Sequence, residues 1–155
     1  MKSILLAALL LGGTALAAHA ERFTFKAVGT TQNSIQVKGD DGKPIGGAFL
    51  TGMADATMAS GKVLHQAYNC EQHTALPGGI FQFLGVCTVT DAGGAFYELF
   101  GCNPTNKEMT ETDCWAGAQG TGGAYAGKTG RVTWHSKPGA DGKTGEAWGE
   151  GAWND

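Results

Sequence analysis

Long apolar runs, basic clusters and metal-ligand spacings are all scarce in this chain of 155 residues. The one extended apolar run is ILLAALLL at residues 4–11, and no later run approaches the about 18 residues that a membrane-spanning helix requires. Lysine and arginine total 11, against 14 aspartate and glutamate residues, and neither sign is clustered. Because nucleic acids and anionic lipids bind basic faces, we expect neither as a partner, and we expect no membrane span.

Signatures of metal binding and of serine hydrolysis are absent as well. The cysteines include no C-x₂-C pair, and no two histidines have H-x-H or H-x₃-H spacing. No serine lies in a G-x-S-x-G context. We therefore expect no metal ion and no other cofactor. The side chains that could be pictured together as a metal site we interpret as scattered surface groups: His65, Glu71, His73 and His135.

The N-terminus has the three parts of a secretory signal peptide. Lys2 supplies a basic start, residues 4–11 are apolar, and Ala18-His19-Ala20 forms an A-x-A-like cleavage site. A buried core helix is the alternative, but it would rarely combine a basic start with this small-residue exit. We predict a removed signal peptide over 1–20, one domain over 21–155, and export to the periplasm or the extracellular space.

Four cysteines follow the predicted cleavage site: Cys70, Cys87, Cys102 and Cys114. An even number of cysteines in an exported chain predicts two disulfides, for which three pairings exist. We favour Cys70–Cys87 and Cys102–Cys114, because each pair closes one hairpin-like segment. A catalytic thiol is the alternative, and an oxidising compartment disfavours it.

Glycine punctuates the chain and disfavours long helices, with 24 of the 135 residues after position 20 being Gly. Short runs rich in β-branched and aromatic residues lie between Gly, Asp and Pro clusters typical of turns. The pattern predicts an all-β domain of about eight strands, a single small antiparallel up-and-down barrel or a sandwich. The strands that we expect are 22–28, 34–38, 47–59, 62–71, 80–90, 95–101, 113–117, 131–136 and 146–153.

The stretch GGAYAGKT at residues 122–129 matches G-x-x-x-x-G-K-[ST], a phosphate-binding pattern of nucleotide triphosphatases. That loop needs a buried strand before it and a helix after it. Here WAGAQGT precedes it, and GRVTWHSKPG follows with Gly130, Val132, Thr133 and Pro138, which oppose a helix. We expect a tight corner between two strands, where glycine relieves crowding and permits positive φ, and no nucleotide site.

The wider stretch GTGGAYAGKTGRVTWH resembles the signature hairpin of the allene oxide cyclase and dirigent barrels, which are small calycin-type secreted β-barrels. In that comparison Gly123, Tyr125, Gly127, Gly130 and Val132 match the family pattern, and the closing GEGAW resembles a last strand of bacterial relatives. The sequence departs from the pattern by one extra residue before Tyr125. The resemblance implies an eight-stranded barrel held here by two disulfides; one such fold hosts many functions.

One carboxylate lies among aromatic residues. Alternation along 95–101 places Phe96, Glu98 and Phe100 on one face, and alternation along 62–71 places Tyr68 with Leu64, Gln66 and Cys70. If these faces point inward, desolvation raises the pKa of Glu98 and suits it to acid–base catalysis with Tyr68. The resemblance adds that allene oxide cyclases have aromatic cavities with an isolated glutamate. The alternative is a Glu98 paired with a basic residue across the sheet or turned to solvent.

The aromatic residues suggest binding of a small molecule. We expect Phe81 and Phe83 to share the face of Cys87 and Val89 and, through the favoured disulfide, that of Tyr68. A barrel of eight strands either fills its interior with side chains or holds one small ligand. The ligand-binding residues that we predict are Phe81, Phe83, Phe96, Phe100, Tyr125 and Trp134.

Three functions follow from these expectations. The first is binding or guiding an apolar, often ring-bearing molecule. The second is a cofactor-independent cyclase, isomerase or lyase that uses Glu98 and Tyr68. The third is a structural or inhibitory interaction protein of the cell envelope.

Overall fold

The computed structural model describes residues 20–40, 42, 44–75, 77–141 and 143–154. The predicted signal peptide, apart from Ala20, lies outside the described residues. Within these ranges no helix has the length and apolar character that a membrane crossing needs.

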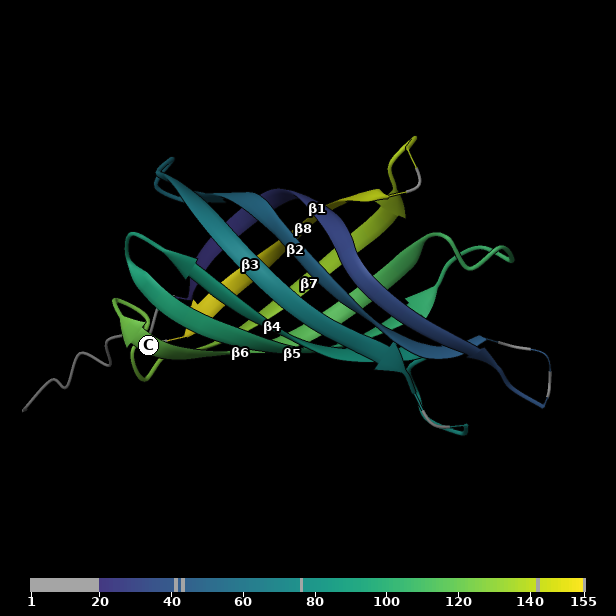
Figure 1. The fold of residues 1–155 in the computed structure, drawn as a ribbon. Helices are drawn as coiled ribbons and strands as arrows, with labels where there is room; N and C mark the ends of the chain where they lie inside the picture. The colour runs from purple at the N-terminus through teal and green to yellow at the C-terminus, as the bar shows by residue number, and fades with distance from the viewer. Residues whose placement is uncertain (1–19, 41, 43, 76, 142, 155) are drawn as a thin grey trace, which may run out of the picture.

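Eight antiparallel strands form a closed barrel in which each strand pairs with its sequence neighbours and β8 pairs with β1 (Figure 1). This arrangement confirms the predicted all-β antiparallel barrel. The strands are β1 Glu21–Lys38, β2 Pro44–Met58, β3 Val63–Thr74, β4 Phe83–Asp91, β5 Gly94–Pro104, β6 Thr112–Gly123, β7 Thr129–Pro138 and β8 Thr144–Asn154.

The predicted strands 22–28 and 34–38 are one strand, so the expected break between them is wrong. The stretch GTTQN at 29–33 has no large apolar residue, yet Thr30 pairs with Thr51 and Thr31 with Leu50. The register then shifts between Thr31 and Asn33, which leaves Gln32 as an extra residue in a β-bulge. Each of the other predicted strands overlaps one observed strand and differs from it only at the ends.

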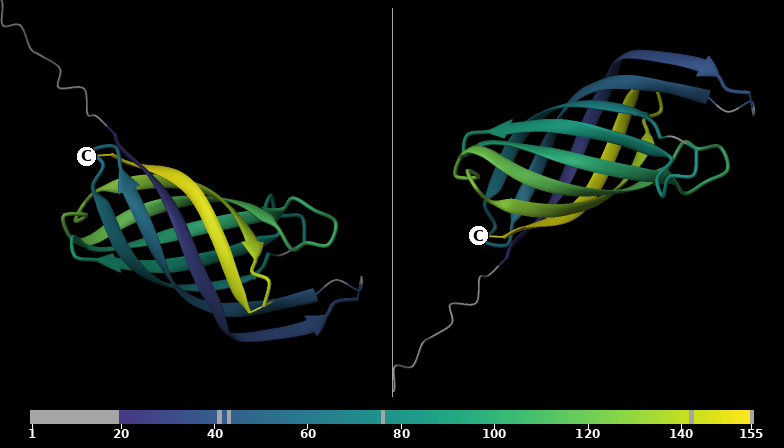
Figure 2. Two further views of the ribbon diagram at one scale, coloured as in Figure 1. Left: turned by 90° about the horizontal axis from the view of Figure 1, so that it is seen from above. Right: turned by 90° about the horizontal axis from the view of Figure 1, so that it is seen from below.

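The two ends of the barrel differ, as the views in Figures 1 and 2 show. At one end, here called the closed end, short turns join β2 to β3, β4 to β5 and β6 to β7. At the other, the open end, connections follow β1, β3, β5 and β7, and those after β3 and β5 are the longest. The β1–β2 hairpin also projects beyond the rim there, because β1 pairs with β8 only as far as Thr30 and β2 pairs with β3 only as far as Gly47.

The stretch GGAYAGKT forms the turn between β6 and β7 at the closed end, with β7 rather than a helix after it. Gly123 and Gly127 have φ of 62° and 80°, which glycine adopts without strain. Gly120 has no room for a side chain beside the Tyr125 backbone. Phe96 pairs with Gly120 and Ala95 with Gly122, so Thr121 occupies a second bulge.

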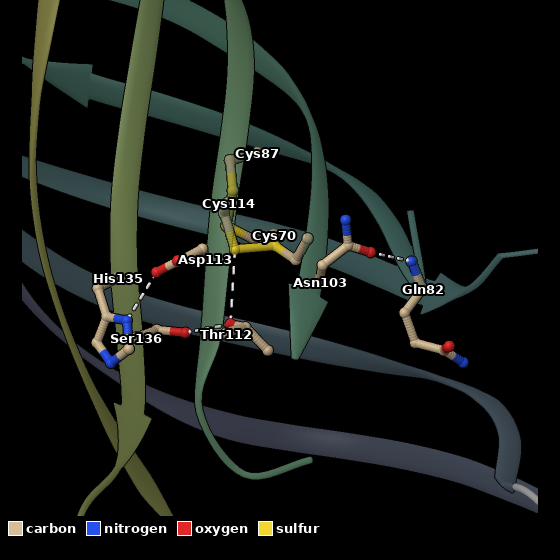
Figure 3. The surroundings of a disulfide bond; sticks show 10 residues. Cys70, Gln82, Cys87, Asn103, Thr112, Asp113, Cys114, His135 and Ser136 are labelled. Atoms are coloured by element: carbon tan, nitrogen blue, oxygen red, sulfur yellow. Dashed lines mark hydrogen bonds and ion pairs between the residues drawn. A yellow bond between two sulfur atoms is a disulfide. The ribbon is translucent and has the colours of Figure 1, made fainter. Parts of the chain in front are cut away.

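Both favoured disulfides are present (Figure 3). Cys70 and Cys87 lie directly opposite each other on β3 and β4, with Cα atoms 4.0 Å apart. Cys102 and Cys114 do the same on β5 and β6, with Cα atoms 4.1 Å apart. All four side chains are buried toward the interior, so they close neighbouring hairpins from inside the barrel and are not available as free thiols.

Candidate functional site: the barrel interior

The interior of the barrel contains a small chamber of about 110 Å³. Residues of six strands line it: Phe23, Phe25, Ala27, Ala54, Gln66, Tyr68, Cys70, Val89, Phe96, Glu98, Val132 and Trp134. Toward the open end lies a mouth of about 340 Å³, and Tyr68, Cys70 and Trp134 line both spaces. The barrel interior is therefore neither wholly filled nor a wide channel.

An aromatic plug seals the chamber toward the closed end. The rings of Phe96, Tyr125 and Trp153 lie pairwise with centroids 5.0 Å apart, and two of the three pairs meet edge to face. The Tyr125 hydroxyl donates a hydrogen bond to Asp91 Oδ2 at 2.6 Å, and Gln66 Nε2 donates to the same oxygen at 3.0 Å. Burial, followed by this bond to Asp91, raises the pKa of Tyr125, so its phenol stays protonated as a donor. These bonds fix the floor of the chamber.

Glu98 points into the chamber from the middle of β5. Its strand neighbours in the pairing register are the disulfide-bonded Cys87 on one side and Ala118 on the other, and neither offers a charge or a hydrogen bond. Within the described residues Glu98 has no hydrogen bond or ion pair, and its remaining accessible surface faces the chamber that it lines. Burial alone raises the pKa of Glu98 from 4.5 to about 7. The alternative of a paired or outward Glu98 is therefore wrong.

Tyr68 lies across two neighbouring strands. Its phenol ring rests over Gly52 of β2 and Gly29 of β1, where a Cβ atom at either position would collide with it. The two glycines thus leave the space that the ring occupies inside the barrel. Burial raises the pKa of Tyr68 above its usual 10.0. Tyr68 and Glu98 are the two titratable groups among the described residues that line the chamber.

The mouth is more polar than the chamber. Thr112 and Ser136 share a hydrogen bond of 2.7 Å across β6 and β7, and Thr112 Oγ1 lies 3.6 Å from Cys114 Sγ (Figure 3). Lys137 pairs with Glu146 at 3.4 Å on the rim. A molecule inside the barrel would therefore meet aromatic rings and one carboxyl group at depth, and hydroxyl and charged groups near the entrance.

Five of the six predicted ligand-binding residues lie in the chamber, the mouth or the plug, and the sixth, Phe81, lies elsewhere. Phe96 and Trp134 line the chamber. Phe83 and Phe100 line the mouth, where the Phe100 ring meets Trp134 edge to face at 5.5 Å. Tyr125 belongs to the plug beneath the chamber.

Phe81 lies outside the barrel, so the prediction that it shares the inner face of Phe83 is wrong. It covers Gly101 on the outer surface, with its ring centroid 6.0 Å from that of Trp115. The predicted strand starts at residue 80, but β4 begins only at Phe83 and the preceding residues form a connection. Residues in a connection do not alternate between faces, so the count does not extend to Phe81.

The predicted ligand-binding residues leave out several residues that line the chamber. Phe23, Phe25 and Val89 are among them, and alternation along β1 and β4 places all three on the inner face. Asp91, which accepts the bonds of the plug, carried no signal, because its partners lie 25 and 34 residues away in the chain.

Two histidines of the outer surface pair with aspartates of neighbouring strands. His65 Nδ1 lies 2.6 Å from Asp55 Oδ1, and His135 Nδ1 lies 2.8 Å from Asp113 Oδ1. Across the part of the chain that the structure describes, no group of three metal-ligating side chains gathers.

No protein-family description matches this chain, and no curated protein is similar to it.

Proposed function

We propose that this protein binds one small, mainly apolar molecule inside the barrel, with a ring or similar apolar group in the chamber. The observation that carries the proposal is an aromatic chamber, closed by a plug at one end and joined to a mouth at the other, with an unpaired carboxyl group inside. Apolar walls with a few convergent polar groups are typical of small-molecule sites. The polar group that such a ligand presents would bond to Glu98 or Tyr68.

The bond to Glu98 depends on pH. Below about 7 the carboxyl group is neutral and donates a hydrogen bond, which suits a carbonyl or ether oxygen. Above about 7 it is ionised and accepts, which suits a hydroxyl or amine donor. A chamber of about 110 Å³ has room for a group comparable to a single ring, so the rest of the ligand would extend into the mouth.

A catalytic role is the second candidate, and the state of Glu98 favours it. A carboxyl group with a pKa of about 7 can give and take a proton near neutral pH. In this proposal Glu98 is the acid–base group and Tyr68 is a neutral hydrogen-bond donor in a cofactor-independent cyclisation, isomerisation or elimination. The eight-stranded barrel and its β6–β7 corner support a relationship to the allene oxide cyclase and dirigent barrels.

We also propose that the protein works outside the cytoplasm. Two buried disulfides indicate an oxidising environment, and the predicted signal peptide provides the route.

Titration with N-phenyl-1-naphthylamine, whose fluorescence rises in apolar surroundings, tests the binding proposal. The wild-type protein should give saturable binding at one site. Ala54→Leu places extra methyl groups in the chamber, since Ala54 is buried and lines it, and should weaken binding at least about ten-fold. Ala67→Leu is the matched control on the outer side of β3 and should bind as wild type. Equal binding by all three proteins would refute the proposal.

A further inference from the structure

The outer wall of the barrel carries an apolar groove of about 760 Å³ over β4, β5 and β6. We call this surface the outer groove; its apolar side chains are Phe81, Leu84, Val86, Leu99 and Trp115. Leu99 is 61% exposed, Trp115 46% and Leu84 38%. Single exposed apolar residues are ordinary, but a contiguous set on one face of a protein marks a contact surface.

One pairing row crosses the outer groove and carries opposite charges at its two ends. Successive registers place Glu71 beside Val86, Val86 beside Leu99, Leu99 beside Gly117, and Gly117 beside Arg131. Leu99 is the centre of this row, with Glu71 two strands away on one side and Arg131 two strands away on the other. Both charged residues line the groove, and neither has an ion pair within the described residues.

We propose that the outer groove is the contact surface between two copies of this chain, related by a two-fold axis that runs parallel to β5 through Leu99. Rotation by half a turn about this axis reverses the order of the strands in the second copy. The row of residues through Leu99 keeps its position along the direction of β5. Leu99 then meets Leu99 of the other copy, and each Glu71 faces an Arg131. The row is therefore complementary in charge to itself, which a surface meant for an unrelated partner has no reason to be.

The shapes along the row also fit this arrangement. Val86 of one copy faces Gly117 of the other, and the space above Gly117 is open, because a Cβ atom there would contact nothing within 4 Å. In the next row toward the open end, Leu84 pairs with Gly101 and Gly101 with Trp115, so Leu84 faces Trp115 of the second copy. Two convex barrels separate away from the axis, and the long side chains of Glu71 and Arg131 span the widening gap.

The apolar surface of the outer groove ends toward the closed end of the barrel. The row beyond Leu99 is polar, with Asn69, Thr88, Tyr97, Gln119 and Thr129 in register. The contact therefore lies on the side wall of the barrel, and the mouth remains open in both copies.

Sedimentation velocity over a concentration series tests the proposal. The wild-type protein should form a dimer, and Leu99→Glu should abolish it, because the substitution places two carboxylates on the axis. Val28→Glu is the matched control, an equally exposed apolar position on the outer face of β1, and should leave the dimer intact. A monomeric wild-type protein, or a Leu99→Glu dimer, would overturn the proposal.

Charge exchange distinguishes this interface from any other dimer. Glu71→Arg and Arg131→Glu each create two like-charge contacts per dimer and should weaken it about ten-fold. The double variant Glu71→Arg/Arg131→Glu restores opposite charges at both contacts and should recover wild-type affinity. A double variant as weak as the singles would show that these residues do not face each other. All these positions are exposed, and circular dichroism verifies that each variant is folded.

Discussion

Glu98 lies inside the barrel without a partner, and desolvation there makes its ionisation unfavourable in the folded protein. In the unfolded chain the same carboxyl group has its ordinary pKa of 4.5, whereas burial raises the folded-state pKa to about 7. Between these values the folded chain holds the proton more tightly than the unfolded chain. The free energy of unfolding must then fall as pH rises through this window and become constant above it.

Glu98→Gln should remove this pH dependence. A shift from 4.5 to about 7 corresponds to about 2–3 kcal/mol of stability lost by the wild-type protein between pH 5 and pH 8. The glutamine variant does not ionise, so its free energy of unfolding should change by much less over the same interval. Urea unfolding at the two pH values measures the difference.

Glu150→Gln is the control for that comparison, because Glu150 is exposed on the outside of β8. It should keep the wild-type pH dependence. A wild-type protein equally stable at pH 5 and pH 8 would show that Glu98 is not desolvated.

Gly52 leaves room for the ring of Tyr68. A Cβ atom at this position would collide with that ring and with the backbone carbonyl of Val28. Gly52→Ala should lower the free energy of unfolding by about 1–3 kcal/mol, because the backbone of β1 cannot move aside as a side chain would. Thermal or urea unfolding measures the loss.

Gly122→Ala is the matched substitution, since a Cβ atom there would contact nothing within 4 Å. Its stability should stay close to that of the wild-type protein. If both alanine variants were equally stable, Tyr68 would not depend on the space above Gly52.

For single residues, the sequence predicts the face of the strand that a side chain occupies. It predicts less well which side chain of another strand lies beside it. Alternation places Glu98 with Phe96 and Phe100, as observed. Whether a basic residue faces Glu98 depends on pairing with Cys87 and Ala118 of other strands, which local patterns do not reveal.

At the scale of elements, the disulfides join neighbouring strands whose pairing already brings the cysteines together. The closed loops span 17 and 12 residues, and each closure contributes about 3 kcal/mol in the chain-entropy account. Removing either disulfide should lower the free energy of unfolding, measured with urea, by about that amount. The two double variants that test this are Cys70→Ala/Cys87→Ala and Cys102→Ala/Cys114→Ala. Reduction of both disulfides in the wild-type protein should lower the free energy of unfolding by more than either double variant does.

Equal stability of oxidised and reduced protein would contradict this account of the two disulfides. The pairing itself was predictable, because short spacing favours closure of single hairpins. Its inward orientation was not, since it depends on how the barrel closes.

Connections and bulges are where the sequence prediction of elements fails. Phe81 follows a strand-like pattern but precedes β4, and the polar stretch at 29–33 continues β1 through a bulge. In both cases the boundary depends on pairing with a distant strand. The β6–β7 turn was predictable, because Gly123 and Gly127 adopt backbone angles that few other residues tolerate.

For the whole molecule, the barrel class follows from regularly spaced strands and turns, but the shape of its interior does not. The sequence left open whether aromatic residues fill the barrel or line a cavity. The structure divides them among a plug, a chamber, a mouth and the outer groove. That division depends on which rings lie over a glycine of a neighbouring strand, as the Phe100 ring lies over Gly85.

Native mass spectrometry of the protein purified from its own host tests most directly whether the barrel holds a small molecule. We predict that the wild-type protein carries one bound molecule of defined mass, and that Ala54→Leu, purified in parallel, carries much less of it. Release of this molecule on unfolding would give its identity. Repeated recovery of wild-type protein at its bare chain mass, together with a failure to bind the naphthylamine probe, would contradict the proposal.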